Sequence, residues 1–205
     1  MEGVVNLKTR THDLIKIALL SAIAAVLMQL GIKLPMLFPS FLEVDFSEVP
    51  ALIGILTISP MSGIIIITLK NLLKLVMFGT STAFVGELAN WVVSIAYVLP
   101  IMYLVRKDKS FQTVVIGIFL GIISMSIIGG VMNYYIMLPF YAKAFMPMDV
   151  IIGMGHAIIP AITDKFTLVV WSIIPFNIFK GIIVSITSVV ILKSLYPVLK
   201  KLKIA

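Results

Sequence analysis

The chain of 205 residues contains no cysteine and little charge, since Asp, Glu, Lys and Arg make up only 12% of it. Without cysteine it can form no disulfide, thiolate metal site or thiol nucleophile. It also has no Walker A motif and no HExxH pair, which are signatures of nucleotide hydrolysis and of zinc proteolysis. These absences argue against an enzyme and against a metal site.

Apolar side chains are present in excess: 60% of the residues are hydrophobic and the mean hydropathy is +1.15. An average soluble domain is about 45–50% apolar and about 25% charged. A fold of this size has too much surface to hide such an excess. The composition therefore predicts an integral membrane protein and excludes a soluble enzyme, a disordered chain and a nucleic-acid binder.

Six apolar segments predict an all-α integral membrane protein, a bundle of six transmembrane helices. A hydrocarbon core of about 30 Å needs roughly 20 apolar residues per helix, so the second and third segments cross only with tilt or local thinning. The first could instead be a signal peptide, but no small-residue cleavage site follows it. The predicted segments are residues 14–32, 47–58, 64–78, 84–105, 114–138 and 166–192.

The basic residues predict the orientation. With both termini in the cytoplasm, ten of the sixteen Lys and Arg residues lie on that side, whereas six of the nine acidic residues lie outside. An excess of Lys and Arg marks cytoplasmic loops. We therefore expect one membrane domain over residues 1–205, with a cytoplasmic N-terminal segment at 1–13, the bundle at 14–192 and a basic cytoplasmic tail at 193–205.

Two loops on the predicted outer side are unusual. Residues 33–46 combine Pro, Phe, Leu and Met with two carboxylates, a composition that favours a lid folded over the mouth of the bundle rather than a loop in the lipid interface. Residues 139–165 form a loop long enough to suggest function, and its apolar stretch at 150–162 indicates a cap or interfacial helix. Loops on one face of a rigid scaffold often build a ligand site.

A polar side chain inside a span usually faces a cavity or a partner, because lipid offers it no hydrogen bonds. Asn177 and Lys180 are three residues apart on one helical face, so we interpret them as a ligand-binding pair. The alternative is a structural pair satisfied by neighbouring helices. Asn133 also favours a site, whereas Asp164 is placed to cap the next helix. No role is assigned to Lys70, Asn71, Glu87 and Asn90.

The first segment carries small residues at helical spacing. Ala18 and Ala22 form one pair four residues apart, and Ser21 and Ala25 form another. Such pairs let a second helix approach closely. They predict either docking of a partner helix or packing within the bundle.

Several motifs occur in an order that resembles one family. They are residues 41–54 (FLEVDFSEVPALIG), 70–73, 81–90, 133–134, 138–139, 160–164 and 175–181. Together they resemble the riboflavin-specific substrate-binding components (S components) of energy-coupling factor (ECF) transporters. The resemblance implies a six-helix bundle with a vitamin pocket near the extracellular side, gated by the first loop. It also implies partners: a membrane coupling subunit (T component) and two cytoplasmic ATPase subunits.

The resemblance also implies roles for individual residues. It puts Asn177 and Lys180 at the uracil-like edge of the flavin ring, with further contacts from Asn133, Asp164, Phe41, Leu42 and Glu43. It assigns docking on the T component to Ala18, Ser21, Ala22 and Ala25.

The expected function is high-affinity binding of riboflavin in the cell membrane of a prokaryote, by a multi-pass subunit that has no cofactor of its own. ATP hydrolysis is then left to the partner subunits, and the residues do not distinguish riboflavin from flavin mononucleotide (FMN) as the ligand. The alternative is a self-sufficient ion-coupled carrier. Such a carrier needs carboxylates buried deep in the spans, and with these boundaries no Asp or Glu lies deep in any span.

Overall fold

The structure is a computed structural model that describes the backbone of residues 2–201 and the side chains of residues 10–194. The side chains of residues 1–9 and 195–205, which belong to the predicted terminal segments, lie outside the described part. The elements in chain order are α1 (Glu2–Gln29), β1 (Ile32–Lys33), β2 (Glu43–Val44), α2 (Glu48–Thr57), α3 (Ser62–Phe78), α4 (Val85–Val105), α5 (Phe111–Met132), the π turn η1 (Asn133–Met137), α6 (Leu138–Ala144), α7 (Met148–His156), α8 (Lys165–Leu168), the π turn η2 (Val169–Ile173) and α9 (Ile174–Lys201).

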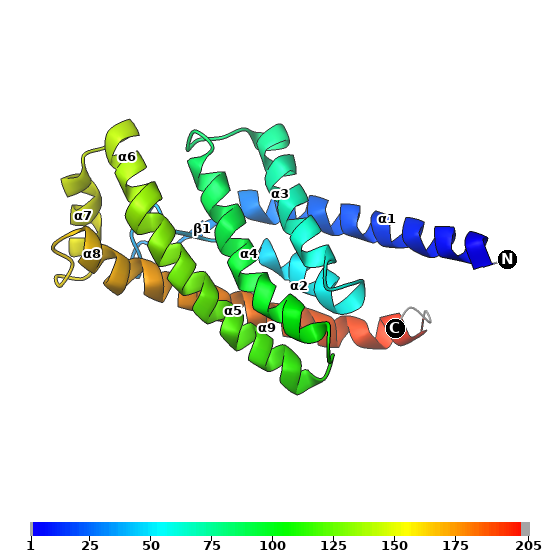
Figure 1. The fold of residues 1–205 in the computed structure, drawn as a ribbon. Helices are drawn as coiled ribbons and strands as arrows, with labels where there is room; N and C mark the ends of the chain where they lie inside the picture. The colour runs from blue at the N-terminus through cyan, green and yellow to red at the C-terminus, as the bar shows by residue number, and fades with distance from the viewer. Residues whose placement is uncertain (1, 202–205) are drawn as a thin grey trace.

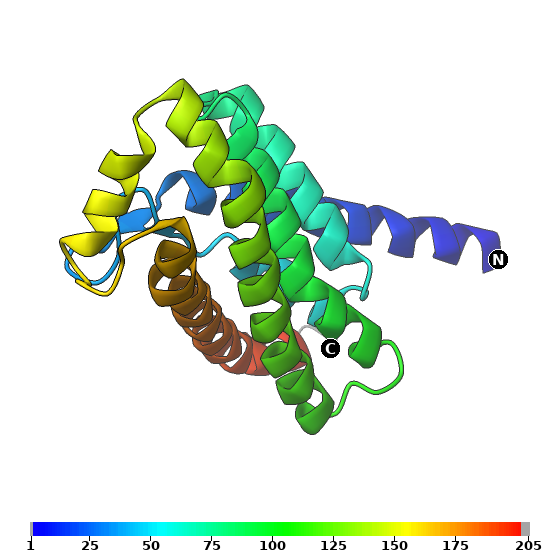
Figure 2. The same ribbon diagram turned by 60° about the vertical axis from the view of Figure 1, so that its left-hand side comes forward.

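The helices form one bundle around the short helix α2, which packs against α1, α3, α4 and α9. Neighbouring pairs α3–α4, α4–α5 and α5–α9 build the rest of the wall. Both views place the start of α1 and the end of α9 at one end of the bundle and α7 and α8 at the other (Figures 1 and 2). Because four helices surround α2, most of its side chains are buried.

The helices have the character of membrane spans. Four stretches are long and apolar enough to cross a bilayer, namely 10–29, 85–105, 111–144 and 165–194. Large apolar side chains are exposed on every long helix, for example Leu14, Val76, Leu99, Phe119 and Ile186. A soluble protein rarely exposes so much apolar surface, so the predicted class, an all-α membrane protein, is confirmed.

The predicted segments at 47–58, 64–78 and 84–105 are confirmed as helices α2, α3 and α4 within a few residues. The predicted end of the fifth segment at residue 138 is wrong, because the helix continues through α6 to Ala144. A π turn lies just before Pro139, and another lies just before Pro175. Proline lacks an N–H and clashes with the carbonyl four residues earlier. A π turn widens the helix at that point, which lets both helices pass through their prolines.

The predicted lid is confirmed as a loop that packs on the bundle. Its ends pair as a two-residue antiparallel ribbon, with Ile32 opposite Val44 and Lys33 opposite Glu43. Its apolar side chains Phe38, Leu42 and Val44 are buried in a cluster with residues of α6, α7, α8 and α9. The predicted cap helix is α7, which covers the same cluster. The lid is therefore held by hydrophobic burial, in keeping with its composition.

Candidate functional site

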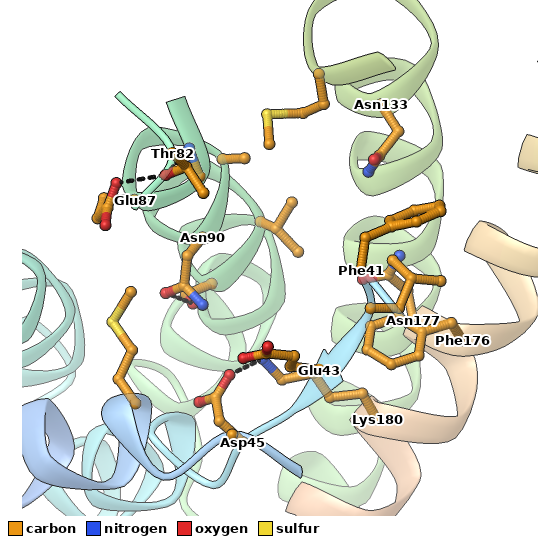
Figure 3. A pocket seen from close by; sticks show the side chains of 18 of the residues that line it. Phe41, Glu43, Asp45, Thr82, Glu87, Asn90, Asn133, Phe176, Asn177 and Lys180 are labelled. Carbon is orange, nitrogen blue, oxygen red and sulfur yellow. Dashed lines mark hydrogen bonds and ion pairs between the residues drawn. The ribbon is translucent and has the colours of Figure 1, made fainter. Parts of the chain in front are cut away.

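A cavity of about 490 Å³ lies between the lid, α3, α4, η1 and α9 (Figure 3). Sites for small molecules are commonly about 300–1,000 Å³. Of the seven residues predicted to bind a substrate, six line this cavity: Phe41, Leu42, Glu43, Asn133, Asn177 and Lys180. Side chains that are up to 139 positions apart in the sequence (Phe41 to Lys180) thus line one cavity.

The α9 wall carries the predicted amide and ammonium. Asn177 and Lys180 are both buried and follow the π turn η2. The Asn177 Nδ2 donates a hydrogen bond to the Ile173 carbonyl at 2.8 Å, which leaves its Oδ1 as an acceptor. A Cβ at residue 129 would lie 2.8 Å from Asn177 Nδ2, so Gly129 is what lets α5 approach this wall.

Aromatic rings stand beside these polar groups. Phe41 of the lid and Phe176 of α9 line the cavity (Figure 3). Phe176 also meets Phe38 of the lid edge to face, with ring centroids 5.3 Å apart. The cavity therefore combines apolar ring faces with a few polar groups, the composition typical of a site for a flat organic molecule.

Lys180 is held by two carboxylates. Its Nζ lies 2.7 Å from Asp45 Oδ2 and 3.3 Å from Glu48 Oε1. Asp45 lies near the end of the lid and Glu48 begins α2, so the contacts of Lys180 join three parts of the chain. The ion pairs agree with the structural alternative, in which neighbouring elements satisfy Lys180. Its place in the cavity lining agrees with the ligand-binding interpretation.

Lys70 of α3 also belongs to this cluster but does not line the cavity. Its Nζ donates to Ser47 Oγ at 2.5 Å, to Glu48 Oε1 at 3.2 Å and to Ser94 Oγ at 3.2 Å. The same Glu48 oxygen accepts from Ser94 at 2.7 Å, whereas its Oε2 is buried without a partner among the described residues. Glu48 therefore bridges the two lysines with one oxygen.

A second ion pair lines the opposite wall. The Nζ of Lys74 lies 2.5 Å from Glu87 Oε1, and both side chains are largely buried. Thr80 and Thr82 each donate to Glu87 Oε2 at 2.9 Å. The Glu87 carboxylate thus fixes the α3–α4 connection beside the cavity. The sequence did not reveal this role, because an acidic residue at the start of a helix is explained by the helix dipole alone.

The comparisons with known proteins bear on this arrangement. Residues 12–192 match the family described as "ECF transporter, substrate-specific component". This chain belongs to that family. The resemblance found in the motifs is thereby confirmed.

Relatives of this S component are named as riboflavin transporters. It is 34% identical over 191 residues to riboflavin transporter FmnP of Bacillus subtilis (strain 168), covering 92% of this chain and 94% of FmnP. It is 33% identical over 189 residues to riboflavin transporter RibU of Staphylococcus aureus (strain TCH60), covering 92% and 93% of the two chains. These relatives are named as transporters and not as enzymes.

A solved structure shares the fold. The S component is similar to the structure described as "Structure and mechanism of the S component of a bacterial ECF transporter", with a TM-score of 0.72 and 31% identity. The match covers 93% of this chain and 99% of the other.

Asp164 is the predicted site residue that does not line the cavity. It is exposed and caps α8, accepting a hydrogen bond from the Thr167 N–H at 2.8 Å. That backbone N–H lowers the pKa of the Asp164 carboxyl below its usual value. Its geometry in this S component is therefore that of the helix cap that the sequence also allowed.

The small residues of α1 divide between two faces. Ser21 and Ala25 are fully buried, and the Ser21 hydroxyl donates to the Ile17 carbonyl at 2.7 Å. Ala18 and Ala22 are exposed. Packing within the bundle therefore accounts for Ser21 and Ala25, whereas Ala18 and Ala22 are accessible to a partner.

The sequence did not point to Asp45, Glu48, Lys70 or Lys74 as site residues. The expectation that no carboxylate lies deep in the bundle is wrong for Glu48, which is 1% exposed, because α2 itself lies inside the bundle. A usable signal was present: a lysine inside a span requires a counter-ion.

Proposed function

We propose that this S component binds riboflavin in the cavity and captures it on the outer side of a prokaryotic cell membrane for an ATP-driven ECF uptake transporter. The observation that carries the proposal is the Asn177–Lys180 pair, which lines a cavity together with aromatic rings and residues of the lid. The names of the relatives support riboflavin as the substrate.

The chemistry of riboflavin suits this cavity. Its fused ring is flat and largely apolar, which matches Phe41 and Phe176, and one ring edge alternates carbonyl oxygens with an N–H. We assign that edge to Asn177 and Lys180, with Asn133 as a third polar contact. The lid residues Leu42 and Glu43 then close over the bound ring.

The proposed topology has six crossings with both termini in the cytoplasm. The α4–α5 connection carries the exposed residues Arg106, Lys107 and Lys109, which the positive-inside rule places in the cytoplasm. The lid and α7 then lie on the extracellular side, where the cavity receives its ligand. Because α2 and α3 have only 10 and 17 residues, they cross with help from neighbouring helices.

The proposed partners are a T component and two cytoplasmic ATPase subunits, which supply the hydrolysis for which this sequence has no motif. No cofactor is proposed, since riboflavin is cargo. We place the contact with the T component at the exposed Ala18–Ala22 face of α1.

The test is direct binding. Riboflavin fluorescence should be quenched by the purified protein at nanomolar to micromolar concentration, and mass spectrometry should find a flavin in protein purified from riboflavin-grown cells. No quenching at a 100-fold higher concentration would contradict riboflavin as the ligand. Proton-driven uptake into vesicles containing this chain alone would contradict the requirement for partners and support the ion-coupled carrier.

A further inference from the structure

The two lysines that share Glu48 differ in how many of their N–H groups are occupied. An ammonium has three N–H donors and no acceptor. Lys70 has three acceptors, one on each of Ser47, Glu48 and Ser94. It is fully buried and does not line the cavity, so it has no donor left for a ligand.

Lys180 has only two acceptors, Asp45 Oδ2 and Glu48 Oε1. No third acceptor for it lies among the side chains that the structure describes. Because the ammonium is tetrahedral, two occupied N–H bonds fix the direction of the remaining one. Lys180 lines the cavity (Figure 3), so the third N–H is the donor available to a ligand.

The charges around the cavity balance. The carboxylates that line it belong to Glu43, Asp45, Glu48 and Glu87. Each has a lysine partner: Lys33 for Glu43, Lys180 for Asp45, Lys70 and Lys180 for Glu48, and Lys74 for Glu87. Four carboxylates therefore meet four ammonium groups, and the described part of the site has no net charge.

We infer that Asp45 and Glu48 are positioning residues that aim one N–H of Lys180 at a neutral acceptor, while Lys70 supplies the charge that keeps the site neutral. This deepens the proposed function and rests on it, because a ring carbonyl of riboflavin is such an acceptor. The same balance selects against an anionic ligand, since no ammonium is left uncompensated for it. FMN, whose phosphate carries about −1.5 to −2 charges at pH 7, should bind more weakly than riboflavin.

The test changes the charge of the cluster in both directions. Glu48→Gln adds one positive charge and keeps an acceptor oxygen, Lys70→Met removes one positive charge, and the double variant restores neutrality. Riboflavin and FMN affinities are measured by fluorescence quenching on each purified protein. The ratio of FMN affinity to riboflavin affinity should rise about tenfold in Glu48→Gln, fall in Lys70→Met and return to within about threefold of wild type in the double variant.

This ratio separates positioning from mere structural support, because a loosened fold would weaken both ligands alike. Equal losses for both ligands, with an unchanged ratio, would overturn the inference. If Glu48→Gln fails to fold, Asp45→Asn replaces it, since loss of the Asp45 carboxylate also adds one positive charge. The asparagine Oδ1 can still accept the hydrogen bond that Asp45 takes from the Ser47 N–H. A wild-type protein that binds neither flavin would contradict the proposed function itself.

Discussion

The ammonium of Lys180 lies 2.7 Å from Asp45 Oδ2, although the two residues are 135 positions apart in the sequence. Asp45 lies near the end of the lid, just before α2, and Lys180 belongs to α9. Their side chains are only 7% and 6% exposed, so water screens the attraction weakly. This ion pair therefore adds to the hydrophobic burial that holds the lid, and it forms part of the polar wall of the cavity.

Asp45→Asn should accelerate riboflavin release. The substitution removes the charge that ties the lid to α9, and breaking a buried ion pair commonly costs about 3–5 kcal/mol. Because Glu48 still contacts Lys180, we expect only part of this free energy to be lost. The dissociation rate of riboflavin should then increase about tenfold or more. Stopped-flow fluorescence after displacement of bound riboflavin measures that rate.

The matched control is Lys33→Gln on the same lid. Lys33 pairs with Glu43 at 3.4 Å, but these side chains are 57% and 47% exposed. An exposed pair contributes about 0–1 kcal/mol, so release should hardly change. If both variants accelerated release equally, the buried pair would not be the anchor of the lid.

Asn177→Leu should weaken riboflavin binding by about 1–3 kcal/mol, the usual penalty when a buried donor of the ligand loses its acceptor. Equilibrium quenching of riboflavin fluorescence measures the affinity. Asn71→Leu is the control, since Asn71 has the same local bond, from its Nδ2 to the Ile67 carbonyl at 2.9 Å, and is buried without lining the cavity. Unchanged affinity in Asn177→Leu would remove this amide from the site.

Much of the fold could be predicted because a membrane-spanning helix requires a continuous run of apolar residues, which is visible in the local sequence. Apolar runs located the helices, and the apolar loop at 33–46 predicted the lid. The helix beyond Pro139 could not be predicted, because a proline ordinarily marks a helix end and the π turn before it is a property of the backbone. The burial of α2 was equally out of reach, since it depends on four helices from different parts of the chain.

The candidate site was likewise predictable from the sequence only in part. Asn177 and Lys180 could be recognised because they lie on one helix with a spacing that places them on one face. The partners of Lys180 could not, since Asp45 and Glu48 are 135 and 132 positions away. Glu48 also carried a plausible local explanation as a residue at a helix start, which concealed its pairing with Lys70.

Asp164→Ala should lower the melting temperature at neutral pH, and the difference from wild type should shrink as the pH falls. The Thr167 N–H lowers the pKa of the Asp164 carboxyl in the folded protein. Such a group stabilises the fold above its unfolded-state pKa, and the contribution is lost as the pH falls through the lowered, folded-state pKa. Thermal unfolding of both proteins across this acidic range checks the prediction.

Asp164→Ser tests the other role that the resemblance implied. Serine retains a capping oxygen but removes the carboxylate, so the melting temperature should stay closer to wild type than in Asp164→Ala. Riboflavin affinity should be unchanged, because Asp164 does not line the cavity. A clear loss of affinity in Asp164→Ser would show that the carboxylate contacts the ligand.

Ala22→Phe should abolish assembly with the T component while leaving riboflavin affinity intact. Ala22 is exposed on α1 and does not line the cavity. A small side chain at this surface is what allows a second helix to approach. Copurification of the T component and its ATPases measures assembly, with Val131→Phe on the exposed face of α5 as the control for added bulk. Ser21→Leu should behave differently, because Ser21 is fully buried, so it should lower stability before it affects assembly. Intact assembly in Ala22→Phe and in Ala18→Phe would move the docking face away from α1.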